Sequence, residues 1–106
     1  MKAKIVRLRP KLAPLPTLQE MVEKVREHVK EGRIGFDHPH VKERMATRGV
    51  TMRQVLEVAK KGEGISGPTL DRWRDWRIKM IRLVAGRRVQ IVVAVTVLEC
   101  VVVTVI

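Results

Sequence analysis

The sequence predicts an α+β fold, with two to three N-terminal helices packed on a curved antiparallel sheet of three to four strands. Apolar residues recur at helical spacing between residues 17 and 62, whereas residues 76–106 contain apolar runs that are typical of strands. Helices that precede the strands, rather than alternating with them, indicate this class. The strand segments are joined by connections too short for a parallel crossover, so the sheet is expected to be antiparallel.

The chain has 106 residues, enough for one compact domain, and its 22 basic and 11 acidic residues give a net charge of +11. An apolar content of 45% excludes a disordered polycation, and an aromatic content of 3% disfavours an RNA binder that stacks bases on an aromatic platform. Residues 1–16 contain five basic residues and no acid. We therefore expect a basic N-terminal arm, either solvated or clamping RNA or an acidic partner, before a single domain over residues 17–106. The single cysteine, Cys100, excludes an internal disulfide and fits a cytoplasmic protein.

Three helices are predicted, over residues 17–32, 37–49 and 51–62. The first and third begin with a capping box, in which a threonine and a glutamate or glutamine three residues later satisfy two backbone N–H groups. Asp37 or His38 is expected to cap the second helix, with Pro39 in its first turn. His28 is expected on the surface of the first helix.

Three strands are predicted, over residues 76–84, 88–97 and 100–106, after a loop over residues 63–68 that is rich in glycine and proline. A fourth strand is expected either from the N-terminal arm or from residues 65–73. The apolar stretch 89–106 approaches the length of a membrane span, but Glu99 and the many β-branched residues in it favour strands. Trp73 and Trp76 are interpreted as core or lid residues rather than as base-stacking residues.

The strongest candidate site is a stripe on the second helix. His40, Arg44 and Arg48 recur every four residues and therefore share one helix face, while Val41 and Met45 face the core. An imidazole moves a proton near neutral pH, and guanidinium groups bind phosphate and stabilise a phosphorane. The alternative is a solvated basic face with a surface histidine. A metal site built on the histidines lacks a third ligand, so no metal and no cofactor is predicted.

The predicted sheet carries a second set of candidate RNA-binding residues: Arg77, Lys79, Arg88, Gln90 and Thr104. Strand alternation places Arg77 and Lys79 on the face opposite the apolar residues of their strand. Gln90 and Thr104 each interrupt an apolar run. Each therefore either faces a site or has an ordinary explanation, which is an edge-facing position for Gln90 and β-propensity for Thr104.

Four segments resemble the signature of a small bacterial family of unknown function: His40, Arg44–Met45, Arg48–Thr51 and Val102–Val105. That family is similar to the superfamily of RelE, MqsR, barnase and the colicin ribonucleases. The resemblance covers residues 36–106. It implies helices followed by a curved antiparallel sheet, metal-independent cleavage of RNA and pairing with an antitoxin.

Carried over by position, the resemblance implies site roles for His40, Arg44 and Thr104. Two positions depart from the family pattern, because Gln90 stands where the family often has histidine and Ile106 where it has tyrosine. Glutamine cannot shuttle a proton at neutral pH. The resemblance therefore supports the fold and RNA binding more strongly than it supports cleavage.

We accordingly expect a toxin-type, metal-independent RNA endonuclease in which His40 transfers the proton. Arg44, with Arg77 or Lys79, would stabilise the phosphorane. The alternative is a non-catalytic RNA-binding module or degenerate toxin, and a third interpretation is an interaction domain whose basic face binds an acidic protein. The expected partners are RNA, an antitoxin protein and a second copy of the chain, in the cytoplasm and without a membrane.

Overall fold

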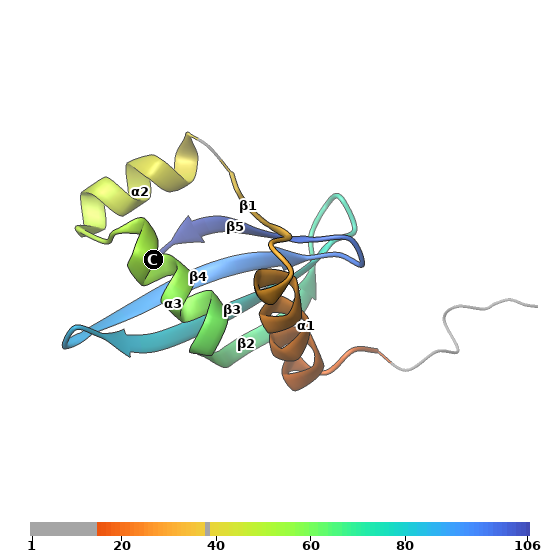
Figure 1. Ribbon diagram of the computed structural model, residues 1–106. Helices are drawn as coiled ribbons and strands as arrows, with labels where there is room; N and C mark the ends of the chain where they lie inside the picture. Colours follow the sequence, from red (N-terminus) through yellow and green to blue (C-terminus); the bar gives the residue numbers. More distant parts are fainter. Residues whose placement is uncertain (1–14, 38) are drawn as a thin grey trace, which may run out of the picture.

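The computed structural model describes residues 15–37 and 39–106, in which three helices pack against a five-stranded sheet (Figure 1). The helices are α1 (Leu18–Lys30), α2 (His40–Arg48) and α3 (Met52–Lys61). The strands are β1 (Ile34–Phe36), β2 (Glu63–Leu70), β3 (Trp76–Val84), β4 (Arg87–Val95) and β5 (Cys100–Val105). The predicted α+β class is confirmed. Residues 1–14 of the predicted basic arm lie outside the described part of the chain.

Helices α1 and α3 begin where the two capping boxes predict. The Thr17 hydroxyl accepts a hydrogen bond from the backbone N–H of Glu20, and the Glu20 carboxylate accepts one from the N–H of Thr17. Thr51 and Gln54 form the same reciprocal pair at α3. An N-terminal cap of this kind stabilises a helix by about 1 kcal/mol, so helices tend to begin at such sequences. The starts of α1 and α3 could therefore be predicted from the sequence.

Helix α2 begins differently from the prediction. Its N-cap is Pro39, and no side chain caps it. The backbone carbonyl of Asp37 accepts from the N–H of Val41 instead, so the Asp37 side chain is not needed there. The alternative cap, His38, lies outside the described residues. At the other end Gly49 adopts the left-handed conformation with φ of 67°, as a glycine that terminates a helix commonly does.

The strand order is β1-β5-β4-β3-β2, so the sheet has one strand more than the three to four predicted. Strands β2 to β5 are antiparallel neighbours, but β1 pairs in parallel with β5, which makes the sheet mixed. The parallel pair is feasible because residues 37–99 separate the two strands, far more than a crossover requires. The prediction missed β1 because three residues carry too little periodicity.

Residues 63–68 belong to β2 and not to a loop. Glycine and proline there suggested a break in structure, but β2 is an edge strand whose pairing with β3 shifts register twice. Edge strands and bulges tolerate both residue types, because a missing N–H or side chain disturbs only one ladder. Gly64 also permits close packing, since a Cβ there would lie 2.7 Å from the Val22 side chain.

The core lies between the helices and one face of the sheet. Val41 and Met45 of α2 are buried in it, as predicted. Alternate residues of the central strands complete it: Ile78, Met80, Val89, Ile91, Val93 and Val95. The apolar stretch 89–106 thus forms β4 and β5, and no helix in the described part of the chain is long and apolar enough to cross a membrane.

Candidate nucleic-acid interface

The side of the sheet that faces away from the helices presents five of the predicted RNA-binding residues: Arg77, Lys79, Arg88, Gln90 and Thr104. Residues paired across neighbouring strands share a face. The pairs Ile78–Val93 and Met80–Ile91 are buried, so the residues between them point to the opposite side. We call this opposite side the open face, because no helix or strand among the described residues covers it (Figure 1).

Lys79 and Thr104 lie in one row across the open face. Lys79 is paired with Val92, and Val92 with Thr104. Neighbouring strands are about 4.8 Å apart, so the two backbones are separated by about 10 Å. Gln90 lies two residues along β4 from Val92 and therefore on the same side. A single RNA strand lying across this row would be within reach of both the Lys79 ammonium group and the Thr104 hydroxyl.

Helix α2 contacts the sheet at the end of β5. Arg44 Nε donates to the carbonyl oxygen of Val105 at 3.2 Å, and the Thr104 hydroxyl donates to the same oxygen at 3.4 Å. Strand β1 pairs with residues 100–102 only, so this carbonyl lies on a strand edge beyond the end of β1. The N–H of Ile106 donates to the carbonyl of Gln90. Arg44, Thr104 and the backbone of Gln90, which are distant in sequence, are thus brought together.

The other two residues of the predicted stripe do not join this group. His40 is exposed at the first residue of α2, and within the described part of the chain its ring has no hydrogen-bond partner. The Arg48 side chain is exposed at the last residue of α2. Of the three, only Arg44 has a described hydrogen bond to the sheet.

Arg87 has a structural role that its position in the sequence did not predict. Its guanidinium donates to the carbonyls of Arg48 and Gly49 at 2.7 and 2.8 Å. These carbonyls lack helical partners because α2 ends there, and guanidinium groups often bind such oxygens. The contact ties the β3–β4 hairpin to the junction of α2 and α3. In the sequence, Gly49 at the expected end of the second helix was the indication that the last carbonyls of this helix would lack helical partners.

Arg77 is ion-paired, unlike the other cations of the open face. Its Nε donates to the Asp71 carboxylate at 2.8 Å. The pKa of Asp71 lies below its usual range, chiefly because the backbone N–H of Asp75 donates to the carboxylate, with further hydrogen bonds from Arg77 and from the N–H of Trp73. Lys79 and Arg88 have no ion pair among the described residues, so their charges are available to an anionic ligand.

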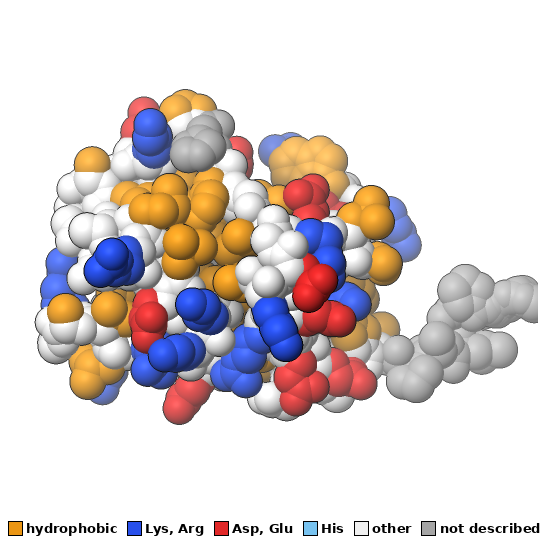
Figure 2. All heavy atoms as spheres, in the orientation of Figure 1, with side chains coloured by type: hydrophobic (Ala, Val, Ile, Leu, Met, Phe, Trp, Pro, Cys, Tyr) orange, Lys and Arg blue, Asp and Glu red, His pale blue; other side chains and the backbone are white. Residues whose placement is uncertain are grey.

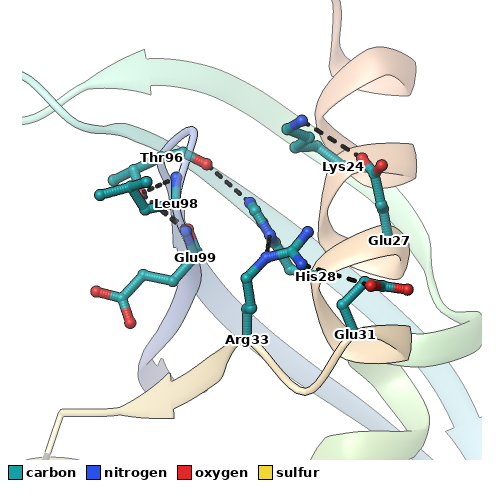
Figure 3. Close-up of polar contacts among 8 residues, drawn as sticks. All are labelled: Lys24, Glu27, His28, Glu31, Arg33, Thr96, Leu98 and Glu99. Carbon is teal, nitrogen blue, oxygen red and sulfur yellow. Dashed lines mark hydrogen bonds and ion pairs between the residues drawn. The ribbon is translucent and has the colours of Figure 1, made fainter.

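His28 is fully buried, so the expectation of a surface position was wrong. Figure 3 shows its ring between the Arg33 guanidinium and the turn after β4. Arg33 Nε donates to Nδ1 at 3.1 Å, which leaves the proton on Nε2 to donate to the Thr96 carbonyl at 2.8 Å. The Thr96 hydroxyl in turn accepts from the N–H groups of Leu98 and Glu99. His28 therefore fastens α1 to the β4–β5 turn and is not placed for catalysis.

The structure contradicts one of the two interpretations of the tryptophans, that they are core residues. Trp73 is 64% exposed in the loop between β2 and β3, and Trp76 is half-buried at the start of β3. Neither is a fully buried core residue. The residue type alone does not distinguish an exposed tryptophan from a buried one, because a large ring is usually buried only in part.

Groups of three or more histidine, cysteine, aspartate or glutamate side chains that could hold a metal ion do not occur in residues 15–37 and 39–106. Cys100 is buried, and this burial raises the pKa of its thiol to about 11. A buried thiol that stays protonated is a poor nucleophile near neutral pH.

Residues 38–106 match the family described as a domain of unknown function, DUF4258. Because this match spans more than half of the chain, the protein belongs to that family. No curated protein and no solved structure matches the chain. The matched segment contains α2, α3 and strands β2 to β5, and therefore every residue of the predicted site.

Proposed function

We propose that the protein binds RNA along the open face and the adjoining α2, holding the phosphate backbone through Arg44, Lys79 and Arg88. The observation that carries the proposal is the shared contact of Arg44 and Thr104 with the Val105 carbonyl. It places Arg44 of the basic helix beside Thr104, which lies at the end of β5 on the open face.

Charge and composition favour a polyanion as the ligand. The net charge is +11, and Lys79 and Arg88 have no ion-pair partner among the described residues. Helix α1 is a poorer candidate, because acidic and basic side chains alternate over it (Figure 2). Contacts to phosphate contribute most of the affinity of sequence-independent binding. RNA, rather than another polyanion, is chosen because of the family resemblance that His40, Arg44 and Thr104 carry.

The salt dependence of RNA affinity tests this proposal. For single-stranded RNA, each phosphate contact lowers log K by about 0.7 per tenfold rise in salt. A Lys79→Ala/Arg88→Ala double variant should therefore reduce the slope by about 1.4. Lys60→Ala, at an exposed lysine of α3 on the helix side, is the control and should leave the slope at its wild-type value. Equal slopes for all three proteins would contradict binding on the open face.

A second candidate function is endonucleolytic cleavage of the bound RNA, as expected of a toxin of the RelE type. One observation favours it: His40 is exposed one helical turn from Arg44, so an imidazole lies beside the proposed phosphate site. In this mechanism the 2′-hydroxyl loses its proton and attacks the adjacent phosphorus, and the bond from phosphorus to the 5′-oxygen of the next nucleotide breaks. One product ends in a 2′,3′-cyclic phosphate and the other in a protonated 5′-hydroxyl. His40 would transfer the proton, and an antitoxin would cover the basic surface.

Cleavage is tested separately from binding. If His40 is the proton-transfer group, His40→Ala should lower the cleavage rate by about 100-fold or more while RNA affinity stays within twofold of wild type. Lys42→Ala, an exposed neighbour on α2, is the matched control. Intact RNA after long incubation with the wild type would leave binding as the function. Unchanged cleavage by His40→Ala would remove His40 from the mechanism.

A further inference from the structure

We infer that the loop between β2 and β3, residues 71–75, stacks an unpaired base of single-stranded RNA on the indole of Trp73. The inference rests on the proposed RNA binding and names a specific contact within it. A low aromatic content argued against an aromatic platform across the protein, but it does not exclude a single stacking residue. Three features of the loop support this role: its exposed ring, its rigidity and its charge.

The ring of Trp73 is the first feature. It is 64% exposed, although tryptophan ordinarily contributes to a fold by burying its large apolar surface. The guanidinium of Arg72 lies 4.6 Å from the ring centroid, in the position of a cation–π contact. Every base has a π-face, so an exposed indole accepts any unpaired base without reading its sequence.

The rigidity of the loop is the second feature. Asp71 Oδ1 accepts from the N–H groups of Trp73 and Asp75, both at 2.9 Å, and Oδ2 is paired with Arg77. The backbones of Asp71 and Asp75 are hydrogen-bonded, and the N–H of Arg74 donates to the Asp71 carbonyl. An exposed loop fixed by this many bonds loses little conformational entropy when it binds, which favours affinity.

Charge and position are the third feature. Arg72 and Arg74 precede and follow Trp73 in the sequence, and both are exposed. Arg72 lies over one face of the indole, and the charge of Arg74 is available to a phosphate of RNA stacked on the ring. The Asp71–Arg77 ion pair joins the loop to the open face. Along β3, Arg77 lies two residues from Lys79, about 7 Å away. RNA held along the open face would therefore reach the loop.

A protein partner is the competing occupant, because Val97 and Leu98 in the β4–β5 turn are also exposed, at 82% and 77%. Arg74 and Val97 line one groove, which shows that the loop and this turn are neighbours. The two arginines beside Trp73 favour an anionic ligand over an apolar one. The experiment below distinguishes the two, since stacking requires an aromatic ring and apolar docking does not.

The test compares an oligouridylate with an oligomer of the same length and charge that lacks bases. The wild type should bind oligouridylate more tightly than the abasic oligomer. In Trp73→Leu, which keeps an apolar side chain, affinity for oligouridylate should fall by about 5- to 150-fold, the range found when a stacking aromatic is removed. Affinity for the abasic oligomer should not change. Trp73→Phe should retain most of the preference, and Leu98→Ala, at an exposed apolar neighbour, should retain all of it.

Fluorescence gives an independent measurement. In a Trp76→Phe background Trp73 is the only tryptophan, and its emission should be quenched by oligouridylate and not by the abasic oligomer. If Trp73→Leu keeps the preference for bases, stacking is wrong while RNA binding stands. If Trp73→Leu and Leu98→Ala weaken both oligomers equally, the patch is a general apolar contact and stacking is again wrong. If the wild type binds neither oligomer, the proposed function fails and the inference fails with it.

Discussion

Replacing His28 with alanine should destabilise the fold strongly without touching the proposed RNA site. The substitution removes a fully buried ring, the partner of the Thr96 carbonyl and the acceptor for Arg33. A buried carbonyl left without a partner costs about 1–3 kcal/mol, and the half-buried Thr96 carbonyl falls at the lower end of this range. A large-to-small substitution in a core adds the cost of a cavity, so the total is about 3–5 kcal/mol.

Loss of this magnitude is easy to measure, because a small domain is stable by only about 5–15 kcal/mol. The midpoint of thermal unfolding, followed by circular dichroism, should fall by at least about 12 °C. The midpoint of urea unfolding should fall with little change in slope, provided that unfolding remains two-state. Lys30→Ala, two residues further along α1 on an exposed side chain, should change stability by less than about 0.5 kcal/mol.

The same variant separates a structural histidine from a catalytic one. Below its lowered unfolding midpoint, His28→Ala should bind RNA as the wild type does, because His28 belongs to the junction of α1 and the β4–β5 turn. Stability within about 0.5 kcal/mol of wild type would refute the reasoning, since it would mean that the Thr96 carbonyl finds another partner at no cost. Lost RNA affinity in the folded variant would instead show that this junction shapes the binding surface.

Four further predictions concern Cys100, Asp71 and Gly64. The raised pKa of Cys100, about 11, should make its thiol react with a disulfide reagent at least about 100-fold more slowly in the folded protein than in the unfolded one near pH 8. Because an unfolded thiol ionises near pH 8.5, the stability linked to Cys100 should be complete below that pH and lost as pH rises toward about 11. Folding lowers the pKa of Asp71, so the pH dependence runs in the opposite direction to that of Cys100. The stabilisation of the loop by Asp71 should persist above about pH 4 and be lost as pH falls further. Trp73 fluorescence in the Trp76→Phe background should report that loss, and Asp71→Asn should abolish the transition. Gly64→Ala should destabilise the fold by about 1–3 kcal/mol in urea unfolding, because the added Cβ meets Val22 and Leu18.

Local signals in the sequence were sufficient for much of the fold. The two capping boxes, Thr17 with Glu20 and Thr51 with Gln54, depend on residues three apart in the sequence. They could therefore be predicted without tertiary information. Alternation along β3 placed Lys79 on the face opposite the core for the same reason. The short strand β1 was not predicted, since it pairs with the distant strand β5. The edge strand β2 was expected only as one of two alternatives, over residues 65–73, and the structure places it over residues 63–70.

In the candidate site, too, some features follow from the sequence alone and others depend on the tertiary structure. The sequence by itself determined which side chains are basic and which face of its own helix or strand each one occupies, because periodicity fixes both. Only the tertiary structure decided that Arg44 and Thr104 share one carbonyl oxygen, that Arg77 is neutralised by Asp71 and that His28 is buried. The contacts of Arg44, Arg77 and His28 each depend on a partner outside the residue's own element. Hydrogen bonds and ion pairs form between side chains that the fold brings within about 3 Å, and no spacing in the sequence encodes that distance.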